Sequence, residues 1–100
     1  MYNIFLSEET AGFLMNLEKE NEKTIRNKIK KLTEYPELFG KHLKGINIWS
    51  LRVGKYRVLY EIDSERTRVF IITVGHRKDV YRKLKKKNRS VQHRNWHGNL

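Results

Sequence analysis

The chain has 100 residues, of which 38% are hydrophobic and 33% charged, and this balance suits one small domain with one core. It contains no cysteine, which excludes disulfides and thiolate metal sites, and its longest apolar run, residues 69–74, is too short to cross a bilayer as a helix. Residues 1–6 lack a basic stretch before their apolar side chains, so we expect no signal peptide and a cytoplasmic location.

Positive charge is the strongest signal in the composition. Lysine and arginine number 22 against 11 acidic residues, which gives a formal net charge of +11. Residues 82–100 contain seven basic side chains and no acidic ones. Such an excess favours a polyanionic partner that is bound through its phosphates. The alternative interpretation is a basic surface that only keeps the protein in solution.

The first half of the chain predicts a strand followed by two helices. Residues 2–6 are short, aromatic and β-branched, which is typical of a strand. Ser7 is a candidate N-cap for a helix that ends near Glu20, and Asn21 is a candidate N-cap for a second helix. Pro36 disfavours helical backbone at the residue before it, so the second helix stops there. The two amphipathic helices predict an antiparallel hairpin.

After residue 45 the hydrophobic period changes from helical to two. Three consecutive strands are expected, at 48–53, 56–62 and 68–74, and a short helical turn reaches about residue 84. We therefore predict an α+β domain over 1–84 in which the helices pack on one face of a sheet whose last three strands form an antiparallel meander. Residues 85–100 show no periodicity and are predicted to be a disordered basic tail.

A two-residue turn at Gly54-Lys55 sets the register of the first two meander strands. Alternation then gives an apolar face that must meet the helices, made of Trp49, Leu51, Val53, Tyr56, Val58, Tyr60 and Ile62. The opposite face is polar and carries Ser50, Arg52, Arg57, Leu59 and Glu61.

The register places Arg52 directly opposite Arg57. Like charges in this position repel, and an anion between them would remove the repulsion, because guanidinium groups grip phosphate in a fork. Two other interpretations stay open at this point. Glu61 or Asp79 neutralises the pair, or both arginines point into solvent.

The segment 75–82 follows the last strand, where loops often carry function. His76 is suited to proton exchange, Arg77 adds a cation, and Tyr81 is able to stack on a base or hydrogen-bond a phosphate or sugar hydroxyl. This set suits RNA cleavage by the ribose 2′-OH. A basic surface turn with Tyr81 packed over the sheet edge is the other interpretation. His93 and His97 are spaced i, i+4 in the tail without an apolar stripe, so no metal site is expected.

The residues around the hairpin resemble those of the RelE branch of the RelE/ParE toxin superfamily. The resemblance covers about residues 2–84 and rests on two strings, Leu51-Arg52-Val53-Gly54-Lys55-Tyr56-Arg57-Val58-Leu59-Tyr60-Glu61-Ile62 after Lys44-Gly45, and Val74-Gly75-His76-Arg77-Lys78-Asp79-Val80-Tyr81. It implies a β-α-α-β-β-β fold and ribosome-dependent, metal-independent cleavage of mRNA without a cofactor. It also implies inhibition by a RelB-like antitoxin, and it leaves open whether the toxin–antitoxin complex forms higher oligomers.

The resemblance also implies roles for particular residues. Arg57 matches the family's phosphate-stabilising arginine, Arg77 matches an arginine assigned to charge stabilisation or proton donation, and Tyr81 matches a tyrosine that orients the substrate. The best-studied bacterial members carry a lysine where Ser50 stands, so the general base is left open, with His76 as a candidate. Additional RNA or phosphate contacts are expected from Arg52, Lys55, Lys44, Lys78 and Arg82.

Two other functions remain open at the level of sequence. A ParE-like toxin shares the fold, binds DNA gyrase and cleaves nothing, but such relatives generally lack the full Arg…His-Arg…Tyr set. A non-catalytic basic RNA-binding module is the other alternative. The fold alone does not discriminate among these functions.

Overall fold

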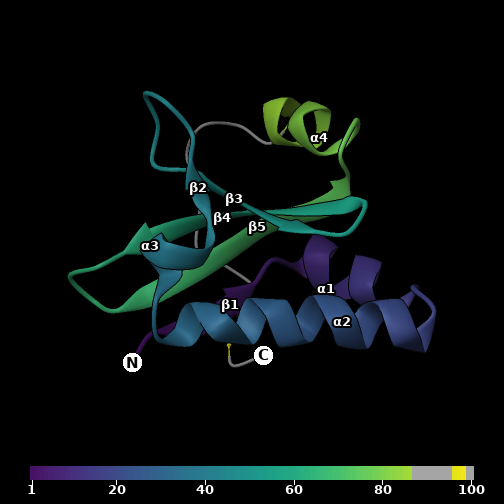
Figure 1. The fold of residues 1–100 in the computed structure, drawn as a ribbon, viewed down its shortest axis with the longest axis horizontal. Helices are drawn as coiled ribbons and strands as arrows, with labels where there is room; N and C mark the ends of the chain where they lie inside the picture. The colour runs from purple at the N-terminus through teal and green to yellow at the C-terminus, as the bar shows by residue number, and fades with distance from the viewer. Residues whose placement is uncertain (87–95, 99–100) are drawn as a thin grey trace.

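The computed structural model describes residues 1–86 and 96–98, and within them the framework is a six-stranded sheet of order β2-β3-β4-β5-β1-β6 (Figure 1). The strands are β1 (Asn3–Leu6), β2 (Lys41–His42), β3 (Trp49–Val53), β4 (Tyr56–Asp63), β5 (Arg68–His76) and β6 (His97–Gly98). β3, β4 and β5 form the predicted antiparallel meander, and β1 pairs in parallel with β5. The predicted α+β fold is therefore confirmed.

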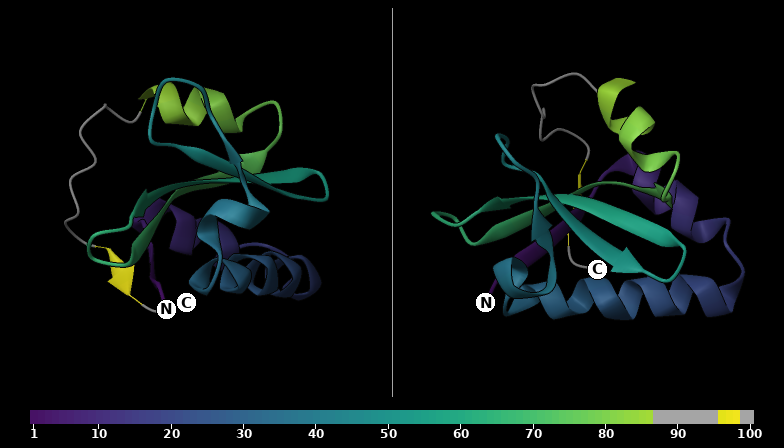
Figure 2. Two further views of the ribbon diagram at one scale, coloured as in Figure 1. Left: turned by 60° about the vertical axis from the view of Figure 1, so that its left-hand side comes forward. Right: turned by 45° about the horizontal axis from the view of Figure 1, so that its top comes forward.

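The helices lie on both faces of the sheet (Figures 1 and 2). α1 (Glu8–Met15) and α2 (Lys19–Lys30) form the predicted hairpin on one face, whereas α4 (Val80–Lys86) lies on the other. A 3₁₀ helix (Lys31–Thr33) and the short α3 (Pro36–Phe39) connect α2 to β2. The prediction that the helices share one face is wrong for α4, because Leu59 and Ile72 form an apolar patch on the second face that Val80 covers.

The ends of the helices differ in part from the predicted ones. Ser7 is the N-cap of α1, as predicted, and its side chain accepts a hydrogen bond from the Thr10 amide. Asn21 is not a cap, because the first bond of α2 already runs from the Glu22 amide to the Glu18 carbonyl and places Asn21 in the first turn. The chain leaves the helical region before Pro36, as predicted, and this proline then begins α3.

The β3–β4 hairpin has the register predicted from its turn. Val53 lies opposite Tyr56 and Arg52 lies opposite Arg57, and Gly54 adopts φ = 59°, which glycine tolerates without strain. The predicted apolar face packs against α1 and α2 in the main core, with Val58 and Tyr60 fully buried and Trp49 half-buried at the margin. The second face is polar near Arg52 and Arg57 and apolar around Leu59.

Tyr60 joins the sheet to the connection that follows α2. Its hydroxyl donates a hydrogen bond of 2.6 Å to the Pro36 carbonyl, and burial together with the nearby Glu37 carboxylate raises the pKa of Tyr60 well above its usual value. Gly40 lies against this hydroxyl so closely that a Cβ at this position would overlap it. The chain therefore requires glycine here for space.

We expect Gly40→Ala to lower the free energy of unfolding by about 1–3 kcal/mol, because overpacking would displace the Tyr60 hydroxyl from the Pro36 carbonyl. Gly12→Ala is the matched control, since no atom lies within 4 Å of a Cβ there and its place in α1 favours alanine by about 0.5–1 kcal/mol. Urea denaturation of both variants measures the effect. Equal stabilities would show that Tyr60 does not depend on Gly40.

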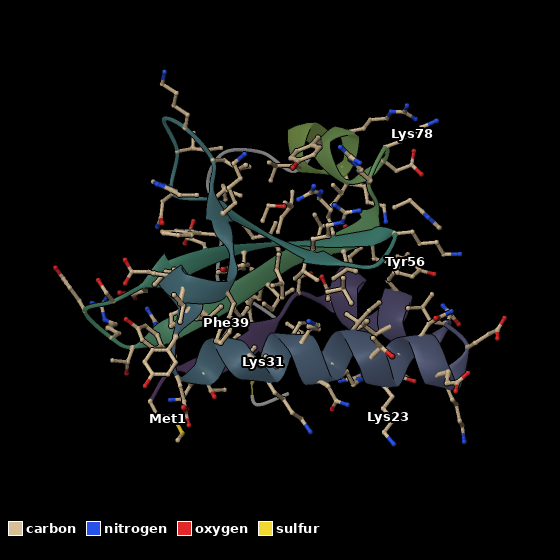
Figure 3. The ribbon with its side chains drawn as sticks, in the orientation of Figure 1. Met1, Lys23, Lys31, Phe39, Tyr56 and Lys78 are labelled. Carbon is tan, nitrogen blue, oxygen red and sulfur yellow. The ribbon has the colours of Figure 1, made fainter. Side chains whose placement is uncertain are left out.

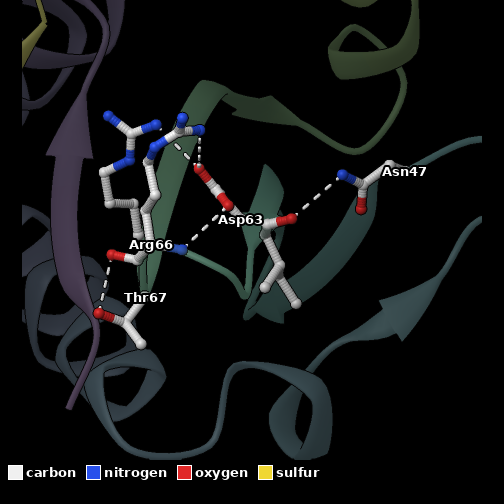
Figure 4. A network of polar contacts seen from close by, with 6 residues as sticks. Asn47, Asp63, Arg66 and Thr67 are labelled. Atoms are coloured by element: carbon white, nitrogen blue, oxygen red, sulfur yellow. Dashed lines mark hydrogen bonds and ion pairs between the residues drawn. The ribbon is translucent and has the colours of Figure 1, made fainter.

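The β4–β5 turn is held by a polar network at the end of the sheet away from the β3–β4 turn (Figure 4). Asp63 accepts hydrogen bonds from the Arg66 amide and from the Arg68 guanidinium, and the hydrogen bond from Arg68 is the main cause of its lowered pKa. A lowered folded-state pKa contributes stability above the unfolded value of 3.8, and this contribution is lost as the pH falls through the folded value. The network therefore stabilises the turn at neutral pH.

Two parts of the predicted tail belong to ordered elements. α4 continues to Lys86, and β6 pairs with β1, while Trp96 packs edge-on against Phe70 with 5.1 Å between the ring centroids. At these positions the structure has regular elements, and the second face of the sheet offers Trp96 an apolar surface. The rest of the predicted tail lies outside the described residues. Among the helices that the structure describes, none has the length and apolar character needed to cross a membrane.

Candidate functional site

Arg52 and Arg57 form a cross-strand pair on the second face of the sheet, the face that α4 partly covers. We call them the arginine pair. Arg52 is exposed and Arg57 is half-buried. On the other neighbouring strand, β5, Arg57 lies opposite Gly75, which has no side chain. The two guanidinium groups therefore project from neighbouring strands at the end of the sheet where the β3–β4 turn lies.

Ser50 supports Arg57 from the same face. Its hydroxyl is buried and accepts a hydrogen bond of 3.2 Å from Nη1 of Arg57. This contact restrains the Arg57 side chain while the rest of its guanidinium remains able to donate to an anion. From the sequence, Ser50 was expected on the polar face and as a departure from the related lysine, but its contact with Arg57 was not predicted. Its position two residues before Arg52, on the same strand face, was the available signal for this contact.

The arginine pair forms no salt bridge with Asp79, one of the carboxylates considered from sequence. Asp79 instead lies 4.0 Å from Arg82, in an exposed contact. Within the described part of the chain, neither Arg52 nor Arg57 takes part in a salt bridge. The like charges are therefore open to an external anion or to solvent, and the interpretation that Asp79 forms a salt bridge with them is wrong.

Arg77 is placed beside the β3–β4 turn by its main chain. Its amide donates a hydrogen bond of 3.2 Å to the Lys55 carbonyl, directly after β5 ends at His76. The Asp79 amide closes the next turn by donating to the His76 carbonyl. The Arg77 side chain is exposed, and no described residue pairs with it. Arg77 therefore lies at the same end of the sheet as the arginine pair.

Tyr81 is carried by α4. Val80 is fully buried against Leu59, Ile72 and Ile48 on the second face, so it anchors the first turn of the helix. Tyr81, the next residue, keeps 38% of its surface exposed. Lys78 and Arg82 flank it and are exposed, and Figure 3 shows Lys78 at the end of the molecule where α4 begins. The interpretation that Tyr81 is packed away over the sheet edge does not fit this exposure.

Two of the predicted site residues, His76 and Lys55, lie on the core face of the sheet, opposite to the face of the arginine pair. His76 is opposite Tyr56 in the register, and the two rings lie 4.9 Å apart, while the Lys55 ammonium lies over the Tyr56 ring at 5.7 Å. Tyr56 belongs to the main core and contacts Phe13 of α1. The structure therefore separates His76 from the arginine pair, because strand alternation sends neighbouring side chains to opposite faces, and Lys55 in the β3–β4 turn also lies against Tyr56.

Lys44 reaches the second face from a different element. It is exposed in the β2–β3 loop, which the hydrogen bond from the Leu43 amide to the Ile48 carbonyl closes. Leu43 packs on the same apolar patch as Val80, so the loop and α4 lie on the same side of the sheet (Figure 1). Lys44 therefore adds positive charge to the face that carries the arginine pair.

We define the candidate site as Arg52, Arg57, Arg77 and Tyr81, with Ser50 beneath Arg57. Among the described residues, no group of three or more histidine, aspartate or glutamate side chains is arranged to hold a metal ion. Guanidinium groups with an exposed aromatic ring suit a phosphodiester and its attached base.

We expect His76→Ala to leave the activity of this site within about threefold of wild type, because the imidazole lies on the opposite face and contacts Tyr56. The assay is single-turnover cleavage of a defined mRNA on ribosomes, which is the activity that the sequence resemblance implies. A loss of cleavage rate of about 100-fold or more, the scale of general acid–base catalysis, would instead show that His76 takes part in the reaction.

Comparison with protein families agrees with this geometry. The model of the ParE toxin of type II toxin–antitoxin systems matches residues 14–81. Over 54 residues the chain is 44% identical to Toxin RelG of Mycobacterium tuberculosis, a match that covers 52% of this chain and 62% of RelG. The chain thus matches less than two thirds of the length of this curated relative. It belongs to the RelE/ParE superfamily, the toxins of type II toxin–antitoxin systems.

Solved structures share the fold. The toxin–antitoxin complex RelBE2 of Mycobacterium tuberculosis matches at 30% identity with a TM-score of 0.69, over 76% of this chain and 98% of that chain. The isolated RelE toxin of E. coli matches at 23% identity with a TM-score of 0.69, over 87% of this chain and 98% of that one, which shows the fold alone. The predicted RelE/ParE membership is confirmed.

Proposed function

We propose that this protein is a toxin that cleaves mRNA on the ribosome and so inhibits translation in the cytoplasm. The observation that carries the proposal is the arginine pair, two directly opposed cations that take part in no salt bridge among the described residues. Arg77 and Tyr81 lie at the same end of the sheet. A phosphodiester supplies the missing negative charge, and its base supplies a stacking partner for Tyr81.

The proposed reaction is transfer within the RNA. The 2′ oxygen of the ribose attacks the adjacent phosphorus as its hydroxyl loses a proton, the bond from phosphorus to the 5′ oxygen breaks, and the leaving oxygen takes up a proton. The products are a 2′,3′-cyclic phosphate and a 5′-hydroxyl. Arg57 and Arg52 stabilise the charge that develops on the phosphate oxygens, Arg77 contributes beside the turn, and Tyr81 orients the nucleotide.

We propose that cleavage depends on the ribosome because the candidate site lacks a strong proton acceptor. It contains neither a carboxylate nor an imidazole, since His76 contacts Tyr56 on the other face. Such a site depends on precise placement of the 2′-OH against the phosphate, which a ribosome-bound mRNA provides. Lys44, Lys78 and Arg82 are exposed around the site and are proposed to hold the RNA backbone.

Primer extension on a defined mRNA tests this function. We expect discrete cleavage within codons when ribosomes are present, and rates on free RNA at the same toxin concentration that are lower by about 100-fold or more, because the reactants are then not held in place. Equally rapid cleavage of free RNA would contradict the ribosome dependence. No cleavage in either case would contradict the nuclease activity.

A second candidate function is inhibition of DNA gyrase without cleavage, as a ParE-like toxin. The family model that matches residues 14–81 bears the ParE name, which favours this alternative. A supercoiling assay with purified gyrase decides between the two. Inhibition of gyrase, together with intact mRNA on ribosomes, would support the alternative.

We also propose a RelB-like antitoxin as the inhibitor, by analogy with the RelBE2 complex that this chain resembles. An acidic, partly disordered chain would be attracted by the net charge of +11, and an amphipathic helix would add apolar burial. Its expected position covers the arginine pair and Arg77. A structure of the complex with these three side chains exposed and ribosome entry unhindered would contradict this mode of inhibition.

A further inference from the structure

On the side where it pairs with β1, strand β5 extends beyond the end of β1. β1 pairs with β5 only as far as Leu6, opposite Ile71, and α1 begins immediately afterwards. The side chain of Ser7 donates a hydrogen bond to the Ile72 carbonyl, which satisfies the next main-chain acceptor. Further along the edge, the Val74 carbonyl accepts a hydrogen bond of 3.0 Å from the ammonium of Lys83 in α4.

Lys83 therefore joins three elements. Its ammonium donates to β5 at Val74 and at the same time lies 4.5 Å from the centre of the Phe13 ring in α1. The side chain is half-buried, and its stem passes from the face that α4 occupies to the edge of β5. A hydrogen bond from a charged donor and a cation–π contact both depend on the ammonium.

Gly75 leaves the space for this side chain. A Cβ at Gly75 would lie 3.0 Å from Nζ of Lys83, a tight contact that the ammonium would relieve by shifting a few tenths of an ångström. Gly75 is also the register partner of Arg57. The contact between Lys83 and β5 therefore lies beside the arginine pair.

α4 has few other attachments. It has seven residues, too few to be stable as an isolated helix, and its apolar anchors are Val80 and Leu84. Tyr81 lies on the exposed side of the same helix. A shift of about 1 Å in this helix would move the Tyr81 ring relative to Arg57, and misplacement on this scale is enough to slow a reaction strongly.

We propose that Lys83 is a positioning residue, which clips α4 to the edge of β5 and thereby sets the position of Tyr81 on the face that carries the arginine pair. The proposal rests on the proposed function only for the effect on cleavage. The clip itself is a property of the free protein and is measured without RNA or ribosomes.

Amide hydrogen exchange of the free protein tests the clip. In Lys83→Met, which keeps the length of the side chain but removes the ammonium, we expect exchange of the amides of residues 80–86 to accelerate about tenfold, the loss expected for a charge-assisted hydrogen bond. Exchange within β4 should stay unchanged. Lys23→Met is the matched control, because Lys23 is exposed on α2 on the far side of the molecule (Figure 3). Unchanged exchange in α4 would overturn the clip.

Single-turnover cleavage on ribosomes tests the positioning. We expect Lys83→Met to lower the rate at saturation by about tenfold while the half-saturating ribosome concentration stays within twofold. Lys83→Arg should restore most of the rate, because a guanidinium also donates to Val74 and stacks on Phe13. Gly75→Ala should slow the rate by displacing Lys83 from the other side.

The outcomes separate the two proposals. Faster exchange with an unchanged cleavage rate would overturn the positioning role of Lys83. If the wild-type protein cleaves no mRNA, the proposed function fails, and the exchange experiment still decides whether Lys83 clips α4.

Discussion

Arg57→Ala is expected to reduce ribosomal mRNA cleavage by about 100-fold or more and to abolish growth arrest, because the loss of one charge-stabilising donor has this magnitude. Arg57 is half-buried, donates to Ser50 and faces Arg52, so its guanidinium is the most restrained of the candidate cations. Restrained donors stabilise a transition state without having to reorganise during the reaction. Single-turnover cleavage measures the effect.

The variant also has a structural consequence that the experiment must separate from catalysis. Removing Arg57 leaves the buried Ser50 hydroxyl without this donor, which costs about 1–3 kcal/mol of stability. Arg57→Ala combined with Ser50→Ala removes both partners and should recover part of the stability but none of the activity. Arg26→Ala is the matched control, since Arg26 pairs with Glu22 on α2, away from the site. A folded Arg57→Ala protein with wild-type cleavage would remove Arg57 from the mechanism.

Tyr81→Ala is expected to reduce cleavage by about 5- to 150-fold, because stacking of one base on an aromatic ring contributes about 1–3 kcal/mol. The ring is partly exposed on α4, and its hydroxyl has no hydrogen bond to any described residue, so the substitution breaks no hydrogen bond among them. Tyr81→Phe keeps the ring and should cost less than about tenfold, the usual value of one neutral hydrogen bond.

The comparison of these two variants identifies the role of Tyr81. A loss in Tyr81→Phe as large as that in Tyr81→Ala would assign the effect to the hydroxyl and contradict the stacking role. Tyr35→Ala serves as the control, because Tyr35 is also an exposed tyrosine but lies between α2 and α3, outside the candidate site. Equal effects of Tyr35→Ala and Tyr81→Ala would indicate general destabilisation.

The sequence alone determined the sheet meander and the opposition of Arg52 and Arg57. Both follow from local chemistry, since a Gly-Lys turn between alternating strands allows one register and each side chain must then face one side or the other. The cap at Ser7 and the break before Pro36 are equally local, because they depend on hydrogen bonds and backbone angles within a few residues.

Only the tertiary structure decided what surrounds this pair. His76 is adjacent in sequence to Arg77, but it points to Tyr56 because strand alternation places it on the other face, and Lys55 in the β3–β4 turn also lies against Tyr56. α4 lies on the second face because Leu59 and Ile72 leave an apolar patch there, which Val80 covers.

Contacts between distant segments have no periodic signal in the sequence. Lys83 reaches both Val74 and Phe13 only after α1, β5 and α4 have packed together. Local propensity determines which elements form, whereas burial of apolar surface determines which faces they share and therefore which polar side chains meet.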